Sequence, residues 1–329
     1  MKNLFSSTVQ AVRNAISNAM TLALTNPSLP EPRLVANMVK NIPLEINNIS
    51  MPGFSVSAGG VFVHQSPNVK WNIPHMHKNY VEIGDLLLLR KEGTREPFRY
   101  RRAMLLQAKK IKPSWNNIPD NPDQHTLYHQ WPRFEYTRLT ALKGQFRHIT
   151  RQDIYMGTKF LLLSDTQSCS GCINRFNCVT APGCLTALPT KPQVNGYRCF
   201  ADELTHFILG LAGKPYNILS SASQQTGWSK VIEDLTTITA QRIAKVAGNS
   251  FARGHGVSDF LSGDVKALTC MQGIDVSNIM RFDENNRNDD IEWNNNEHGN
   301  DDPGFSIIEF TISENEQQIE NNQRNTINC

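Results

Sequence analysis

The chain has 329 residues, of which 39% are hydrophobic and 19% are charged. These values are typical of a soluble globular protein with one large domain or two modest ones. The absence of an uncharged apolar run of about 18 residues argues against a membrane-spanning helix. Arg13, Asn14 and Asn18 interrupt the apolar stretch near the N-terminus. That stretch therefore predicts an amphipathic helix in place of a signal peptide, and a cytoplasmic location is expected.

Charge is distributed unevenly along the chain, although the formal net charge is only +3. Residues 86–151 contain fourteen Lys or Arg and five Asp or Glu, whereas residues 283–329 contain two basic and twelve acidic residues. A basic block of this kind is typical of proteins that bind a polyanion. The acidic end is either a solubilising tail or a segment that competes with nucleic acid for the basic block.

Two helices are predicted first, over residues 6–25 and 28–42. Pro30 and Pro32 fall in the opening turn of the second helix, where the missing N–H of proline does no harm. Glu31 precedes the apolar positions of that helix by about one turn, so its side chain is expected to project over the same face.

Three strands follow. Residues 53–65 predict a strand or hairpin in which the Gly59-Gly60 pair marks a bulge or turn. Residues 81–90 and 100–110 predict two apolar strands joined by a polar hairpin loop.

A helix over residues 122–143, interrupted by Pro132, and a short strand over 158–165 come next. The predicted order is therefore helix, three strands, helix, strand. Near-continuous apolar runs in the strands indicate a central sheet that is covered on both faces.

Beyond residue 165 the pattern changes. Residues 200–248 read as two helical segments that each end in glycine. The last residues are low-complexity Asn, Asp and Glu with one strand-like island, which predicts a mostly disordered tail. The expected organisation is an N-terminal helix (1–28), a core (29–165), a cysteine-rich insert (166–200), a helical segment (201–282) and an acidic tail (283–329).

Polar residues interrupt the apolar strands. Asp85 lies in one strand, and Gln107 and Lys109 share a face of the next, so antiparallel pairing would bring the three together. A hard divalent cation, bound by Asp85, the Gln107 amide oxygen and a strand carbonyl, would compensate for the desolvated carboxylate. Lys109 would then orient or deprotonate a metal-bound water. The alternative is an Asp85–Lys109 ion pair without chemistry.

This pattern, with an acid on a preceding helix, resembles the PD-(D/E)xK nuclease superfamily. The Gln-x-Lys version resembles its Mrr-type restriction and anti-phage defence nucleases. The resemblance covers about residues 29–165. It implies an α/β fold of the restriction-endonuclease type, with a central mixed sheet flanked by helices. It also implies Mg²⁺-dependent hydrolysis of DNA phosphodiester bonds.

The same resemblance assigns roles to four residues. Asp85 becomes the central Mg²⁺ ligand, Gln107 the second ligand, Lys109 the residue that serves the attacking water, and Glu31 the helix acid. Gln107 brings no charge, so the site has fewer carboxylates than the family pattern. Glu82 competes with Glu31 as the additional acid, although it should face the opposite side of the strand unless the strand bulges.

Basic residues near the two strands are expected to neutralise DNA phosphates. The candidates are Arg99, Arg101, Arg102, Lys110 and Lys112. The alternative is a solvated charged hairpin.

All seven cysteines follow residue 168, and an odd, clustered set favours metal ligation over disulfides. The candidate ligands are Cys169, Cys172, Cys178 and Cys184, with Cys199 as an alternative fourth. Zn²⁺ in a structural site is the first interpretation, and an iron–sulfur cluster is the second. Part of this spacing resembles the cluster loop of certain CRISPR-associated and recombination nucleases of the same superfamily. Ordinary free thiols are the remaining alternative.

The sequence thus predicts a Mg²⁺-dependent DNA endonuclease, and the resemblance alone suggests a restriction or anti-phage role. The expected partners are DNA, a regulatory or sensor protein of a defence system, and further copies of the chain, without a membrane. The alternative is a non-catalytic nucleic-acid-binding or assembly subunit of such a system with a structural zinc site.

Overall fold

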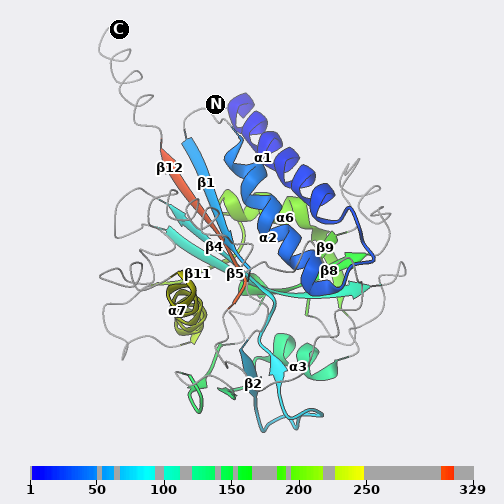
Figure 1. Cartoon of the computed structure of the whole chain (residues 1–329), viewed down its shortest axis with the longest axis vertical. Coiled ribbons are helices and arrows are strands. Elements are labelled where there is room, and N and C mark those ends of the chain that lie inside the picture. The colour runs from blue at the N-terminus through cyan, green and yellow to red at the C-terminus, as the bar shows by residue number, and fades with distance from the viewer. Residues whose placement is uncertain are drawn as a thin grey trace.

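The structure is a computed structural model that describes eleven segments of the chain (Figure 1). These are residues 2–49, 54–62, 67–92, 100–111, 121–137, 142–150, 155–164, 184–189, 194–217, 227–247 and 305–314. No helix within them is both long and apolar enough to cross a membrane.

An eight-stranded sheet forms the centre of the molecule. Seven strands follow the spatial order β1 (Phe54–Val61), β12 (Ile307–Glu314), β4 (Leu86–Glu92), β5 (Tyr100–Ile111), β8 (Thr158–Ser164), β9 (Cys184–Leu188) and β10 (Asn195–Cys199). The short β11 (Lys214–Pro215) pairs with β5 near the start of that strand. The β12–β4 and β5–β8 pairs are parallel and the other pairs are antiparallel. The expected α/β class with a mixed central sheet is therefore confirmed.

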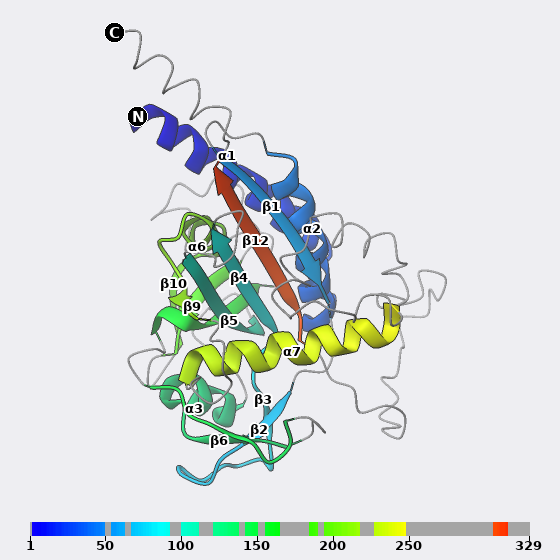
Figure 2. The same ribbon diagram turned by 90° about the vertical axis from the view of Figure 1, so that its left-hand side faces the viewer.

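Helices cover both faces of this sheet. The helices α1 (Lys2–Ala23), α2 (Glu31–Asn47) and α6 (Phe200–Ile208) pack on one face, and α3 (Pro122–Gln130) and α7 (Gly227–Ala247) lie on the other (Figures 1 and 2). Leu86 and Leu88 of β4 point toward α1 and α2, whereas Leu87 and Leu89 point toward α7. Because successive strand side chains alternate between faces, a continuous apolar run supplies both cores.

A second, four-stranded antiparallel sheet lies on the α3 side. Its order is β3 (Val81–Glu82), β2 (Asn68–Lys70), β6 (Phe134–Tyr136) and β7 (Phe146–Arg147). The single strand predicted over residues 81–90 is thus wrong: its first residues join this small sheet, and its last ones join the central sheet as β4. The chain bends between them at residues 83–85.

The helix predicted over residues 122–143 is also shorter than expected. It ends at Gln130, and Trp131 adopts a left-handed backbone with φ 42° before Pro132. A proline disfavours helical backbone in the residue that precedes it, so the helix stops there. The chain then continues into β6.

The glycine pair of β1 forms no turn. Residues Gly59 and Gly60 lie inside the strand and pair with Glu309 and Ile308 of β12. A Cβ atom at Gly60 would lie 2.4 Å from the carbonyl oxygen of Val39. The glycine is therefore needed because α2 packs closely against the strand.

The acidic C-terminal segment contributes β12 to the interior of the sheet. Ile308, Phe310 and Ile312 face the α2 side, and Ile307 faces the α7 side. The strand-like island expected in this segment is confirmed as β12, whereas the description of 283–329 as a disordered tail is wrong for residues 305–314, because their alternating apolar side chains reach both cores. The rest of residues 283–329 lies outside the described segments.

A buried ion pair joins β12 to β4. Lys91 Nζ lies 2.6 Å from Glu309 Oε1, and the two side chains are 2% and 1% exposed. Burial raises the pKa of Glu309 to about 7, although Lys91 and the nearby Arg101 act to lower it. The pair contributes to stability only while Glu309 is ionised.

We expect Lys91→Met to lower the free energy of unfolding by about 3 kcal/mol at about pH 8, because it leaves a buried carboxylate without its main partner. The loss should shrink toward about pH 5, where Glu309 is protonated in both proteins. Urea denaturation at the two pH values measures both quantities.

The control is the double variant Lys91→Met, Glu309→Leu, which replaces the pair by apolar groups. It should recover most of the stability at about pH 8. An equal loss in the single and double variants would show that the pair contributes nothing beyond packing.

Candidate active site

The bend between β3 and β4 positions Asp85. The Asp85 N–H donates to the Leu106 carbonyl at 2.8 Å, and the Ile83 N–H donates to the Pro67 carbonyl at 3.0 Å. The hydroxyl of the buried Tyr128 donates to the Ile83 carbonyl at 3.0 Å. A Cβ atom at Gly84 would lie only 2.6 Å from that hydroxyl, so a glycine is required at the bend.

The Asp85 carboxylate points toward β5. Its Oδ2 atom accepts hydrogen bonds from the Ala108 N–H, at 2.8 Å, and from Nε2 of Gln107. The register pairs Leu86 with Leu106, so Asp85 falls opposite Gln107 where β4 begins. The structure therefore brings together two of the residues that the sequence singled out.

Gln107 is fully buried and only half satisfied. Its Nε2 atom donates to Asp85, whereas its Oε1 atom has no hydrogen-bond partner. A buried amide oxygen without a donor is costly, so its presence calls for a reason. An unfilled ligand position is one such reason.

Lys109 and Glu31 form the second half of the cluster. Lys109 Nζ lies 3.3 Å from Oε1 of Glu31, and the Lys110 N–H donates to Glu31 Oε2 at 2.9 Å. Glu31 is the first residue of α2, and Lys109 is near the end of β5. Lys109 thus pairs with the helix acid, and no simple Asp85–Lys109 ion pair forms.

The cluster contains more acidic side chains than basic ones. Desolvation raises the pKa of Asp85 well above its usual range, and the nearby Glu31 and Glu82 raise it further, whereas Lys109 lowers it. Desolvation also raises the pKa of Glu82, with Lys109 and Glu31 acting in opposite directions. Glu82 is therefore close enough to act on Asp85, because the chain bends between them instead of continuing as one strand.

The carboxylates of this cluster do not by themselves complete a metal site. Within the segments that the structure describes, no group of three or more His, Cys, Asp or Glu side chains is arranged to hold a metal ion. A cation at Asp85 would also need the Gln107 oxygen, backbone oxygens or water.

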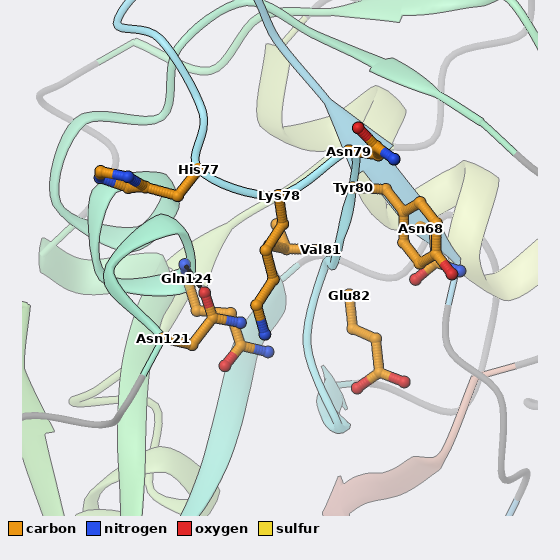
Figure 3. A pocket seen from close by; sticks show the side chains of 9 residues that line it. All are labelled: Asn68, His77, Lys78, Asn79, Tyr80, Val81, Glu82, Asn121 and Gln124. Carbon is orange, nitrogen blue, oxygen red and sulfur yellow. Dashed lines mark hydrogen bonds between the residues drawn. The ribbon is translucent and has the colours of Figure 1, made fainter.

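A polar hollow of about 680 Å³ opens beside Glu82 (Figure 3). Its lining comes from the β2–β3 region and from the start of α3. The lining residues are Asn68, His77, Lys78, Asn79, Tyr80, Val81, Glu82, Asn121 and Gln124. Sequence reasoning did not find this hollow, because its residues come together only through the small sheet.

Of the described residues that were predicted to contact phosphates, only Lys110 lies near Lys109. Arg101 is 7% exposed and lies close to Glu309, and Arg102 donates to the Gly213 carbonyl at 2.8 Å. Both lie near the start of β5, far from Lys109, so a DNA contact by the buried Arg101 is not supported. Lys110 is exposed and its Nζ donates to the Leu29 carbonyl at 3.1 Å. Arg99 and Lys112 lie outside the described segments.

Of the four predicted cysteine ligands, only Cys184 lies within the described segments. Cys184 begins β9 and is buried in the core on the α6 side, and burial, with Cys199 nearby, raises its pKa well above the usual range. Cys169, Cys172 and Cys178 lie outside the described segments. The zinc or iron–sulfur site stays a prediction.

No family model, curated protein or solved structure matches the chain.

We expect Asp85→Asn to stabilise the metal-free protein. Because the pKa of Asp85 is raised in the fold, stability is lost as the pH rises from the ordinary carboxyl range through the raised pKa. The neutral amide avoids this loss. Urea denaturation with a chelator should show a gain of about 1 kcal/mol at about pH 8, since the residue keeps partial exposure, and almost none near pH 4.

Asp123→Asn is the matched control. Asp123 accepts hydrogen bonds from the His77 and Lys78 N–H groups, at 3.0 and 2.7 Å, and so has a structural role. Its substitution should lower stability by about 1–3 kcal/mol. If Asp85→Asn lowered stability by as much, Asp85 would be an ordinary structural carboxylate.

Proposed function

We propose that this protein is a Mg²⁺-dependent nuclease that hydrolyses phosphodiester bonds of DNA. One observation supports the proposal above the others. A desolvated carboxylate, Asp85, accepts a hydrogen bond from the amide nitrogen of Gln107, whose buried amide oxygen has no partner, and Lys109 and Glu31 lie beside them. This combination is costly in a purely structural role.

The donors fit a hard cation. Magnesium prefers oxygen ligands and usually keeps several waters, so one or two carboxylates are enough. Turning the Gln107 amide by half a turn would place Oε1 toward the Asp85 carboxylate. Two oxygens in that arrangement repel one another unless a cation lies between them. Asp85 and Gln107 would then hold the ion, with Glu82 as a further candidate.

Bound magnesium would polarise the scissile phosphate and lower the pKa of a coordinated water. The side chains of the protein would bind the ion and orient the groups around the attacking water. Asp85 would bind the ion in its deprotonated form, and Glu31 orients the Lys109 ammonium through their ion pair. Lys109 then donates hydrogen bonds to the attacking water or to the phosphate oxygens and offsets the charge that develops there.

The order of elements also supports the proposal. Helix α2, strands β1, β4 and β5, helix α3 and strand β8 come in the order that the sequence predicted for a restriction-endonuclease-like core, with the four strands of the small sheet inserted between β1 and β4 and between α3 and β8. Strand β12 is an addition to this core, between β1 and β4. The restriction or anti-phage role rests on the sequence resemblance, as do a sensor partner and self-association.

A nucleic-acid-binding subunit without catalysis is the second candidate. It is favoured by the neutral Gln107 and by the lack, among the described residues, of three metal-ligating side chains in one group. Such a protein would bind DNA equally well with and without Asp85 and would never cut it.

We expect Asp85→Asn and Lys109→Ala to lower Mg²⁺-dependent cleavage by at least about a hundredfold, because each removes a group needed in the transition state. Supercoiled plasmid, single-stranded DNA and RNA are the substrates, and gel electrophoresis measures the rate. Lys40→Ala is the control, since Lys40 is an exposed lysine of α2.

Both variants should retain DNA affinity within about threefold at constant salt. Wild-type protein that binds DNA but never cuts any of the three substrates with Mg²⁺ or Mn²⁺ would refute the nuclease and favour the binding subunit.

Metal binding should release protons. Below its raised pKa, Asp85 carries a proton that the ion must displace, so Mn²⁺ affinity should rise as the pH rises through that pKa. Calorimetry in two buffers of different ionisation enthalpy measures the protons released. Asp85→Asn should abolish the release, and Glu45→Gln, elsewhere on α2, should leave it unchanged. A pH-independent affinity would exclude Asp85 as a ligand.

A further inference from the structure

The hollow beside Glu82 is polar, and its groups come from two directions. The segment that leads into β3 supplies Lys78 and Tyr80, and the start of α3 supplies Asn121 and Gln124. In Figure 3 the Lys78 amine extends toward the amides of Asn121 and Gln124, whereas His77 points away.

The positions of these groups are determined by the backbone. Asp123 accepts hydrogen bonds from the N–H groups of His77 and Lys78, which ties the segment before β3 to the start of α3. Asn121 caps the helix by accepting from the N–H groups of Asp123 and Gln124 at 3.2 and 3.3 Å. The two walls of the hollow are thus joined by hydrogen bonds.

The chemistry of the lining suits a nucleotide. Tyr80 is 40% exposed as a residue, and its ring offers a stacking surface for a base. Side-chain amides both donate and accept, which matches the edge of an unpaired base. Lys78 supplies a cation for a phosphate, and a volume of about 680 Å³ lies within the usual range for small-molecule sites.

Glu82 connects the hollow to the candidate active site. It lines the hollow and precedes Asp85 by three residues at the bend, and its carboxyl group interacts electrostatically with Asp85 and Lys109. A strand whose phosphate reaches Asp85 would therefore place a neighbouring nucleotide at the hollow.

We propose that the hollow receives one unpaired nucleotide of the substrate strand, next to the scissile phosphate. This inference rests on the proposed nuclease function, because that function places a nucleic-acid strand at Asp85. The base stacks on Tyr80, its edge meets the amides of Asn68 and Gln124, and Lys78 contacts a flanking phosphate. The enzyme then prefers DNA with an unpaired nucleotide over a fully paired duplex.

The test compares three duplexes without divalent metal, so that nothing is cut. One is fully paired, one has a single bulged thymidine, and one has a bulged abasic site at the same position. Fluorescence anisotropy measures the affinities. We expect wild-type protein to bind the thymidine bulge about tenfold more tightly than the other two, the size expected for one base stacked on an aromatic ring.

Tyr80→Ala and Tyr80→Leu should abolish this preference, whereas Tyr80→Phe, which keeps the ring, should retain it. Tyr155→Ala is the matched control, because Tyr155 is 42% exposed and does not line the hollow. Lys78→Ala should weaken binding to all three duplexes by the same factor, since a phosphate contact does not read a base. The same bulge in an RNA duplex shows whether the sugar matters.

A preference for the thymidine bulge that survives both Tyr80→Ala and Tyr80→Leu would overturn the inference, as would equal affinity of wild-type protein for the three duplexes. Binding of free thymidine monophosphate without any bulge preference would also overturn it and would indicate a small-molecule site. Because these measurements need no cleavage, they separate the two proposals. A protein that cuts DNA but shows no bulge preference keeps the nuclease and loses the nucleotide pocket.

Discussion

The hydrogen bonds that the Asp85 carboxylate accepts from Ala108 and Gln107 are the interactions on which the candidate site depends. They fix an acid at the junction of β4 and β5, where desolvation and two neighbouring acids disfavour its charge. The Tyr128 hydroxyl stabilises the bend that carries Asp85 by donating to the Ile83 carbonyl, and Gly84 leaves room for the tyrosine. A sequence under selection for stability alone would replace the acid, so the arrangement indicates a function that uses its charge.

The sheet gives this junction its rigidity. Strand β4 pairs with β5 on one side and with β12 on the other, and β12 comes from the far end of the chain. The Lys91–Glu309 pair fixes the β4–β12 contact inside the sheet. Residues 307–314 of the acidic C-terminal end therefore take part in the framework of the site.

The sequence predicted the central sheet and the contact between Asp85 and Gln107 well, because both follow from apolar periodicity and from the alternation of side chains along strands. Features that depend on contacts between residues far apart in the sequence were predicted less well. The bend at Gly84 was read as part of a strand, since only the packing of Tyr128 reveals it. Strand β12 was read as an island in a disordered tail, because its partners lie more than two hundred residues earlier in the sequence. The polar hollow has no local signature at all.

The pairing of charges distinguishes the candidate site from the rest of the interior. Elsewhere, three of the described buried acids have cationic partners: Glu309 pairs with Lys91, Glu203 with Lys159 and Arg198, and Asp234 with Arg147. The fourth, Asp123, accepts hydrogen bonds from two backbone N–H groups instead. At the junction, Asp85, Glu31 and Glu82 interact with one ammonium group, that of Lys109, while the Lys110 ammonium is directed to backbone carbonyls. Matched pairs are what a stable core requires. An excess of acids next to an unsatisfied amide oxygen is what a cation site requires, and this imbalance is the strongest physical reason to assign chemistry to this end of the sheet.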